Sequence, residues 1–240
     1  MSRRSLSPAL LLVILVAGLC LADLARGEQF TVSTFGDSLT AGYPYWSGDG
    51  NGCVPPCGGY QPPLQTKLRA TDRDALVRNY GKGGEGTGGG VSRIDAVITS
   101  STPRYILLME GTNELYWGSA HTVRDNLGYM IDKARARGVL PVLGTITPDP
   151  RYPEKNIPGA NKLLRDLAQK KKVALADHYS ALIGNWSNLC TSDRMHPNRT
   201  GYSIMAQTWA DAMTETDQLA APLPAKTPPL TPILMLLLDE

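Results

Sequence analysis

The residues of this chain whose types and spacing could do chemistry together are a serine, a histidine and an aspartate. Ser38 lies in the stretch FGDSLTAG, whereas Asp193 and His196 lie three positions apart in SDRMHPN, far along the 240-residue chain. A serine hydroxyl is a poor nucleophile at neutral pH, so it needs a base within hydrogen-bond reach and a third group that orients the base. Because residues three positions apart face the same side of a helix or tight turn, His196 and Asp193 fit these two roles. The pattern predicts attack by Ser38 on a carbonyl carbon.

Attack on an ester carbonyl creates an oxyanion, which needs preorganised hydrogen-bond donors. In the stretch NYGKGGEG, the glycines at 81, 83 and 84 have no side chain that would keep a backbone N–H away from a ligand. Asn113, in the stretch EGTNE, offers a side-chain amide as a further donor. These residues are candidates for an oxyanion hole. A plain turn is the alternative role for Asn113.

The first three of these stretches along the chain each follow a short apolar run that predicts a buried strand, and SDRMHPN comes after the last such run, near the end of the chain. The five runs cover residues 30–35, 75–80, 105–109, 140–146 and 173–176. Apolar residues at helical spacing lie between the runs, as in TVRDNLGYMIDKARAR. Strands that alternate with helices predict a three-layer α/β/α sandwich with a five-stranded parallel sheet, and ligands bind such sheets at the carboxyl ends of the strands. The candidate residues are expected to meet at that edge.

The start of the chain predicts a signal peptide in residues 1–27. Two arginines precede an unbroken apolar stretch over residues 9–22, and small residues suited to a signal peptidase follow. The stretch is shorter than the roughly 18 to 20 apolar residues of a membrane span, and an uncleaved anchor is the alternative. We expect an exported protein, periplasmic or secreted, with one domain over residues 28–216, a proline-rich tail over 217–240 and no membrane span in the mature chain.

Export would bring the remaining cysteines into an oxidising compartment. Cys53 and Cys57 flank two prolines in CVPPC, where the chain can turn back on itself, so this pair is the predicted disulfide. A bridge from Cys190 to either of them is the alternative. Three cysteines at these spacings without a nearby histidine do not predict a zinc site, so no metal is expected.

Composition and motif endings exclude several classes of partner and fold. The formal net charge is +2 and 19% of the residues are charged, so the chain has no basic excess suited to nucleic acid. The stretch GKGGEGTGGG lacks the Gly-Lys-Ser/Thr ending of a phosphate-binding loop, which argues against nucleotide binding. Thr40 stands where the second glycine of a G-x-S-x-G nucleophile elbow would be, which disfavours an α/β-hydrolase fold.

Taken together, these motifs resemble those of the GDSL lipase/esterase family in the SGNH hydrolase superfamily. The family's blocks GDS, N-x-G-x-x-G, G-x-N-D and D-x-x-H-P occur in family order and match, in turn, Gly36, Asp37 and Ser38; Asn79, Gly81 and Gly84; Gly111 and Asn113; Asp193, His196 and Pro197. The sequence departs from the family pattern at Glu114, where aspartate is usual. It also departs at Arg194 and Met195, which replace the commoner glycine and hydrophobic residue.

The resemblance implies a flavodoxin-like SGNH hydrolase fold and a serine esterase without a metal or organic cofactor. Ser38 would be the nucleophile, His196 the base and Asp193 the group that orients it. The backbone N–H groups of Ser38 and Gly84 and the amide of Asn113 would form the oxyanion hole. We expect a small-molecule, lipid or sugar ester as substrate, with short-chain acyl, aryl or acetylated-sugar esters preferred. Acyl transfer through the same residues, and carbohydrate or lipid binding without catalysis, are the alternatives.

Aromatic residues predict an apolar or sugar-stacking rim over the nucleophile. The candidates are Tyr43, Tyr45, Trp46 and Tyr60 in the long loop after Ser38, and Trp117 in a later loop. Packing of these rings within their own loops is the alternative.

Two other histidines compete with His196 for the role of base. His178 follows the fifth apolar run, but the neighbouring Asp177 does not share its face, and His121 lies where a helix is expected to start. For Ser38 itself, the alternative role is that of a helix cap.

Overall fold

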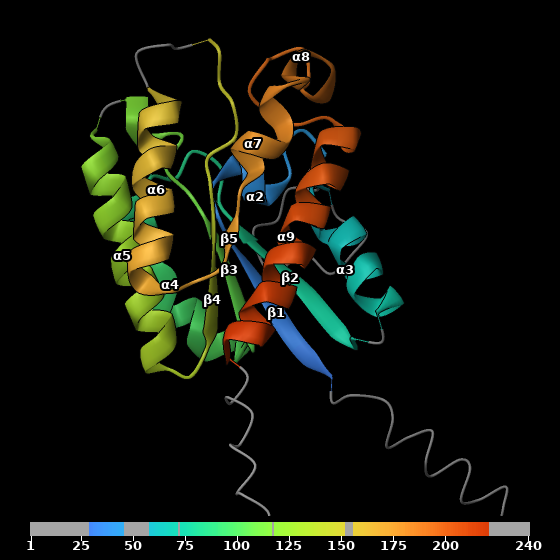
Figure 1. Ribbon diagram of the computed structural model, residues 1–240, viewed down its shortest axis with the longest axis vertical. Helices are drawn as coiled ribbons and strands as arrows, with labels where there is room; N and C mark the ends of the chain where they lie inside the picture. Colours follow the sequence, from blue (N-terminus) through green and yellow to red (C-terminus); the bar gives the residue numbers. More distant parts are fainter. Residues whose placement is uncertain (1–28, 46–57, 72, 117, 152–155, 221–240) are drawn as a thin grey trace, which may run out of the picture.

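The computed structural model of the chain describes residues 29–45, 58–71, 73–116, 118–151 and 156–220. These residues form one sheet of five parallel strands in the order β2-β1-β3-β4-β5 (Figure 1). The strands are β1 (Phe30–Gly36), β2 (Ala75–Gly81), β3 (Tyr105–Met109), β4 (Leu140–Gly144) and β5 (Leu175–Ala176). The predicted parallel sheet is confirmed, although β4 and β5 are each two residues shorter than the apolar runs that predicted them.

Helices cover both faces of the sheet, which confirms the predicted three-layer α/β/α sandwich (Figure 1). One face packs against α4 (Thr87–Ser101), α5 (Ala120–Ala136) and α6 (Ile157–Lys171), and the other against α3 (Gln61–Ala70) and α9 (Arg199–Ala220). Four short helices lie near the carboxyl ends of the strands: α2 (Ser38–Ala41), the 3-10 helix η1 (Glu114–Tyr116), α7 (His178–Ile183) and α8 (Trp186–Leu189).

Alternating side chains along the strands build a separate core on each face of the sheet. On β1, Val32 packs towards α3 and α9, whereas Phe35 packs towards α4 and α5. On β3, Leu107 and Leu108 divide in the same way. A strand buried on both faces reads as a continuous apolar run, which is why β3 has the sequence YILLM.

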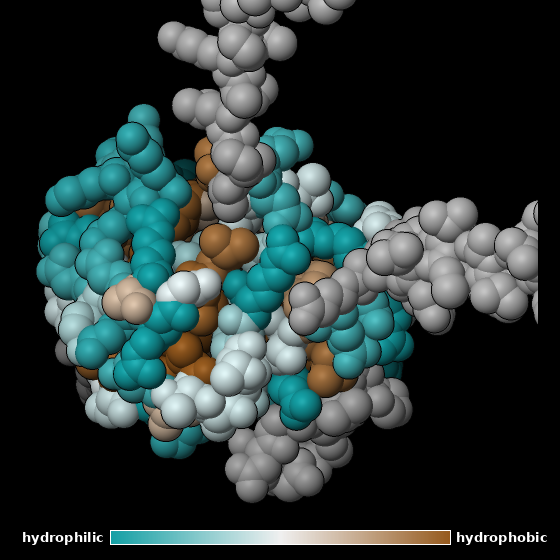
Figure 2. Space-filling view, turned by 90° about the horizontal axis from the view of Figure 1, so that it is seen from below, coloured by the Kyte–Doolittle hydropathy of each residue, from teal (hydrophilic) through white to brown (hydrophobic). Residues whose placement is uncertain are grey.

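Figure 2 shows the end of the molecule opposite to the carboxyl ends of the strands. Hydrophilic side chains cover much of this surface, and a hydrophobic strip appears between them.

Several sequence predictions fall on residues outside the described ranges. These are the signal peptide, the disulfide between Cys53 and Cys57, and residues 221–240 of the predicted tail. Cys190 forms no disulfide with another described residue. Helix α9 continues to Ala220, past the predicted domain end at residue 216. Among the described residues, no helix has both the length and the hydropathy needed to cross a bilayer.

Candidate active site

The turn from β1 into α2 presents Ser38 at the carboxyl edge of the sheet. Asp37 is the N-cap of α2, and its Oδ1 accepts a hydrogen bond from the N–H of Leu39 at 2.9 Å. This bond satisfies a backbone donor that the first turn of the helix leaves unpaired. Gly36 directly precedes this cap. No side chain fits at position 36, because a Cβ there would lie 1.9 Å from the carbonyl oxygen of Met109. The turn therefore runs close against β3 and leaves the Ser38 side chain partly exposed.

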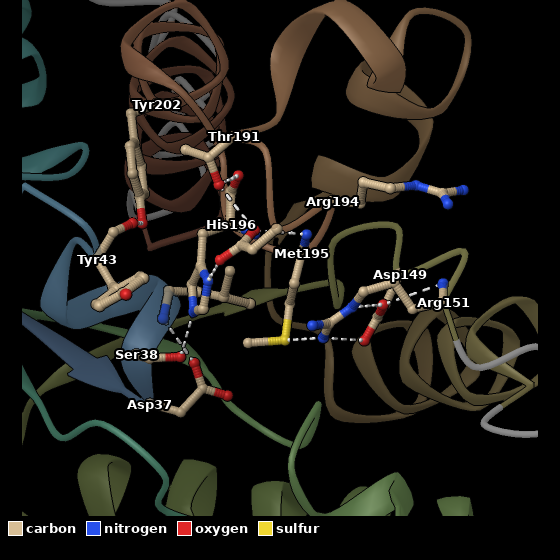
Figure 3. A network of polar contacts seen from close by, with 12 residues as sticks. Asp37, Ser38, Tyr43, Asp149, Arg151, Thr191, Arg194, Met195, His196 and Tyr202 are labelled. Atoms are coloured by element: carbon tan, nitrogen blue, oxygen red, sulfur yellow. Dashed lines mark hydrogen bonds and ion pairs between the residues drawn. The ribbon is translucent and has the colours of Figure 1, made fainter.

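A closed loop near the end of the chain brings the acid and the base to Ser38. The N–H of Thr191 donates to the carbonyl of His196 at 2.8 Å, which closes the loop around Asp193. Nε2 of His196 lies 2.8 Å from Oγ of Ser38, and Nδ1 of His196 lies 2.6 Å from Oδ2 of Asp193 (Figure 3). The three side chains predicted to act together thus form one continuous series of hydrogen bonds.

Hydrogen bonds favour the ionised form of Asp193. Its Oδ1 accepts from the Thr191 hydroxyl at 2.7 Å and from the N–H groups of Met195 and His196 at 2.9 and 3.0 Å. Partial burial acts to raise the pKa of Asp193, but these bonds and the contact with the His196 ring outweigh it and lower the pKa well below its ordinary value. An ionised Asp193 accepts the Nδ1 proton of His196, which leaves Nε2 free to accept the proton of the Ser38 hydroxyl.

The two departures in this loop, Arg194 and Met195, are accommodated without loss of the loop's hydrogen bonds. Arg194 adopts a φ of 61°, the left-handed region in which glycine is least strained, and its carbonyl accepts from the indole N–H of Trp186 at 3.1 Å. The sulfur of Met195 contacts the guanidinium of Arg151, which pairs with Asp149 at 2.9 Å. Figure 3 shows the Met195 side chain between Ser38 and this ion pair.

The loops after β2 and β3 meet at the predicted oxyanion donors. Nδ2 of Asn113 donates to the carbonyl oxygen of Glu85 at 2.9 Å, which joins the Asn113 loop to the segment that contains Gly84. Gly84 has a φ of 75°, and no atom lies within 4 Å of the position that a Cβ would occupy. An amide nitrogen carries two protons, so one proton of Asn113 stays available for a ligand while the other bonds Glu85.

Two further residues of the matched blocks hold backbone segments together. The amide of Asn79 donates to the carbonyl of Ala41 at 3.0 Å, and its Oδ1 accepts from the N–H of Gly81 at 2.9 Å. Asn79 thereby fixes the end of β2 against α2. Glu114 accepts a hydrogen bond from the N–H of Thr87 at 2.7 Å and another from the Thr87 hydroxyl. The longer side chain at 114 thus caps α4, whose own N-cap is a glycine.

Of the aromatic residues predicted to form a rim, Tyr43 and Tyr45 lie near the Asp193 loop or the start of α9, whereas the placement of Tyr60 was wrong. Tyr43 is 48% exposed, its ring centroid lies 4.6 Å from that of His196, and its carbonyl accepts from the Tyr202 hydroxyl at 2.8 Å. Tyr45 is half-buried against the Tyr202 ring. Tyr60 does not belong to a rim, because it is fully buried in the core and its hydroxyl donates to Thr40 at 3.2 Å. Trp46 and Trp117 lie outside the described residues.

The two competing histidines lie away from Ser38. His178 is fully buried with its ring 4.7 Å from that of Trp209, and burial lowers its pKa to about 3, so the ring is neutral at pH 7. His121 is exposed in the first turn of α5. His196 is the histidine that contacts Ser38.

Three buried carboxyl groups lie near the nucleophile turn; Asp37 was named from the sequence only as part of its motif, and the other two were not named. Asp37, Glu85 and Glu110 are at most 7% exposed. Burial, reinforced by repulsion from neighbouring acids, raises the pKa of Asp37 to about 7 and that of Glu110 to about 10. Glu85 pairs with Arg93, whose Nε lies 2.6 Å from Oε2. Glu110 directly follows the apolar run of residues 105–109, and this position was the signal in the sequence that could have identified it.

A hollow of about 960 Å³ opens on the far side of the Asp193 loop. Its walls include Tyr179, Trp186, Thr191 and Arg194, together with the loop after β4. Ser38 and the oxyanion donors do not line it, so this hollow is separate from the position at which a carbonyl carbon would meet the nucleophile.

Comparison with known proteins finds a matching family model and related proteins. Residues 34–204 match the model of the GDSL-like Lipase/Acylhydrolase family. The chain is similar to Esterase TesA of Pseudomonas aeruginosa, with 26% identity over 188 residues that cover 77% of this chain and 89% of the relative. It is 24% identical to an arylesterase of Vibrio mimicus over 187 residues, which cover 78% of this chain and 88% of the relative. The solved structure of the esterase EstA from Pseudoalteromonas sp. shares the fold with a TM-score of 0.62 and 22% identity, over 77% of this chain and 97% of that one.

Proposed function

Since this chain belongs to the GDSL-like lipase/acylhydrolase family and is a carboxylic ester hydrolase, we propose that it acts through an acyl-enzyme formed on Ser38. The observation that carries the proposal is the continuous contact from Ser38 Oγ to His196 Nε2, at 2.8 Å, and from His196 Nδ1 to Asp193 Oδ2, at 2.6 Å. Both distances are those of hydrogen bonds, in the order that nucleophile, base and orienting acid require.

In the acylation half of the reaction, Oγ of Ser38 attacks the ester carbonyl while Nε2 of His196 takes the hydroxyl proton. Asp193 accepts the Nδ1 proton of His196 throughout, so it fixes the tautomer of the ring and stabilises the imidazolium that forms. His196 then gives the proton to the departing alcohol. A Ser38 acyl ester remains.

The oxyanion of the tetrahedral intermediate is held by three donors from three loops. The backbone N–H of Ser38 follows β1, the backbone N–H of Gly84 follows β2, and the side-chain amide of Asn113 follows β3. Such donors stabilise the transition state more than the ground state, because the carbonyl oxygen gains charge only as the nucleophile attacks.

In the deacylation half, water replaces Ser38 as the nucleophile. Nε2 of His196 takes a proton from the water, the second tetrahedral intermediate uses the same donors, and the proton returns to Ser38 as the acid leaves. No step in this sequence requires a metal or an organic cofactor.

We propose esters with short acyl groups as substrates, including aryl and acetylated-sugar esters. Tyr43, beside His196, and Tyr116, three residues after Asn113, are 48% and 46% exposed and offer flat surfaces to an aromatic or sugar leaving group. One relative is named an arylesterase, which agrees with the aryl part of this proposal.

We also propose that the enzyme is exported and acts in the periplasm or the medium. The support is the sequence of residues 1–27, with its basic start and its short apolar stretch. Sequencing the amino terminus of the protein recovered outside the cytoplasm tests this; an intact Met1 would contradict cleavage.

Hydrolysis of p-nitrophenyl esters from acetate to palmitate by the purified enzyme tests the proposed reaction. Ser38→Ala should abolish activity, and Ser203→Ala, which removes an exposed hydroxyl on α9, should leave it unchanged. We expect the highest kcat/KM for the shortest acyl groups. Full activity in Ser38→Ala would refute the proposed nucleophile, whereas a product acylated by an added alcohol would show that transfer competes with hydrolysis.

A further inference from the structure

Arg93, in the second turn of α4, contacts two of the loops that carry the proposed oxyanion donors. Its Nη2 donates to the carbonyl oxygen of Gly36 at 3.1 Å, and its Nε donates to Oε2 of Glu85 at 2.6 Å. The guanidinium also lies over the ring of Phe35, 3.8 Å from the ring centroid. These contacts fix the plane of the guanidinium, since cation–π stacking and the planar donor pattern restrict its orientation.

Each contact leads to an oxyanion donor by a short covalent or hydrogen-bonded path. Gly36 lies two residues before Ser38. Glu85 directly follows Gly84, and the carbonyl of Glu85 accepts the amide of Asn113 at 2.9 Å. One guanidinium therefore joins the backbone before the nucleophile to the segment that contains Gly84 and accepts the hydrogen bond of the Asn113 amide.

Helix α4 begins with residues that make room for this arrangement at a cost in helix stability. A Cβ at Gly89 would lie 2.8 Å from Cγ of Glu85, and a Cβ at Gly90 would lie 2.2 Å from Oε2 of Glu110. Glycine in a helix costs roughly 1 kcal/mol relative to alanine. Two glycines in the first turns of α4 thus let the buried carboxyl groups and Arg93 come together.

We propose that Arg93 is a positioning residue for the oxyanion hole, one that sets the spacing between the N–H of Ser38 and the donors of Gly84 and Asn113. The proposal rests on the proposed function, because it needs an oxyanion to form on attack by Ser38. Arg93 does not touch the substrate. It acts through Gly36 and Glu85.

A role in spacing differs from simple neutralisation of the buried Glu85 charge. The Glu85 side chain is only 3% exposed and pairs with Arg93 at 2.6 Å and with Lys82, which is itself exposed, at 3.4 Å, so removal of the Arg93 cation would destabilise the fold. Lysine at 93 supplies one ammonium group, which can pair with Glu85 but lacks the fork that reaches the Gly36 carbonyl at the same time. Arg93→Lys should therefore restore stability without restoring the spacing of the donors.

The test is the rate at which a p-nitrophenyl alkylphosphonate labels Ser38. In this step the Ser38 Oγ–phosphorus bond forms as the bond to p-nitrophenolate breaks, the hydroxyl proton passes to His196, and the phosphonyl oxygen occupies the oxyanion hole. The rate is measured, with the melting temperature, for wild type, Ser38→Ala, Arg93→Met, Arg93→Lys and Arg165→Met. Arg165 is the matched control. It lies on α6, away from the site, and its guanidinium pairs with Asp177 at 2.9 Å.

We expect Arg93→Met and Arg93→Lys to slow labelling about 10- to 100-fold, the effect of misplacing donors rather than deleting them. Arg93→Lys should melt near wild type, and Arg165→Met should label at the wild-type rate. Combined with Asn113→Ala, Arg93→Lys should lose less than the product of the two single effects, because both act on one group.

Two results overturn the inference in different ways. Wild-type labelling rates in Arg93→Lys would mean that Arg93 only neutralises Glu85, and the proposed function would stand. Equal labelling of wild type and Ser38→Ala would refute the proposed function, and the role of Arg93 with it. If Arg93→Met does not fold, the comparison of Arg93→Lys with wild type decides between these results.

Discussion

The side-chain amide of Asn113 is hydrogen-bonded to the backbone carbonyl of Glu85 at 2.9 Å, immediately after the glycine whose N–H is the second proposed oxyanion donor. This bond orients the amide before any substrate arrives. A donor that is already in place pays no reorganisation cost when charge develops on the substrate oxygen. The relationship explains why an asparagine after β3 can act together with a glycine after β2.

Asn113→Ala should lower kcat about 100- to 1,000-fold with little change in KM, because the lost hydrogen bond forms mainly in the transition state. Steady-state kinetics on p-nitrophenyl acetate measures the effect. The control is Asn126→Ala. The Asn126 amide donates to the hydroxyl of Thr87 and is not a proposed oxyanion donor, so this variant should retain kcat within a few-fold. A wild-type kcat in Asn113→Ala would remove Asn113 from the oxyanion hole.

Tyr43 packs its ring against His196, 4.6 Å between centroids, while the Tyr202 hydroxyl holds the Tyr43 carbonyl. Tyr43→Ala should lower kcat/KM about 2- to 10-fold, the equivalent of one aromatic contact, because His196 loses a neighbour that limits its ring orientations. Tyr43→Phe keeps the ring and should match wild type across an ester series. Equal losses in the two variants would indicate that the Tyr43 hydroxyl, not its ring, contributes.

Much of this arrangement could be predicted from the sequence, because it depends on local patterns. Apolar runs between helical segments indicated the parallel sheet. The serine, glycine and asparagine blocks follow the first three strands and the histidine block comes after the fifth, so one sheet edge was expected to gather them. Tyr60 was placed wrongly on the rim. Its spacing with Leu64 and Leu68, four residues apart each time, was an available signal that it belongs to the buried face of α3.

The buried acids could not be predicted in the same way. Asp37, Glu85 and Glu110 come from three loops, and their separations along the chain follow no helical or strand period. Their proximity appears only when the strands are assembled in the order β2-β1-β3. Arg93 is one of many arginines in the sequence, and no local pattern distinguishes it from those on the surface. Its contacts with Gly36 and Glu85 also form only when β1 and β2 are paired.

Glu110 should make the stability of the fold depend on pH above neutrality. Burial raises its pKa to about 10 from an unfolded value near 4.5, so between these values the native state keeps a proton that the unfolded state loses. Stability must then fall as pH rises, by up to about 1.4 kcal/mol per pH unit. From pH 7.5 to 9, His178 is neutral in both states, and Asp37, with a pKa of about 7, is largely ionised in both.

Glu110→Gln, which cannot ionise, should flatten this dependence. Urea unfolding at pH 7.5, 8.25 and 9 compares the free energies of unfolding of wild type, Glu110→Gln and Glu215→Gln, where Glu215 is an exposed acid on α9. Parallel pH profiles for wild type and Glu110→Gln would show that Glu110 does not hold its proton in the native state.

The most direct test of the central claim is the detection of an acyl group on Ser38. Rapid mixing of the enzyme with p-nitrophenyl acetate, followed by acid quenching and mass analysis of peptides, should show a burst of p-nitrophenol no larger than the enzyme concentration. One acyl group should be found on the peptide that contains Ser38. His196→Ala should show neither the burst nor the acyl group. Turnover without any acylated peptide, or an acyl group on another residue, would contradict the account.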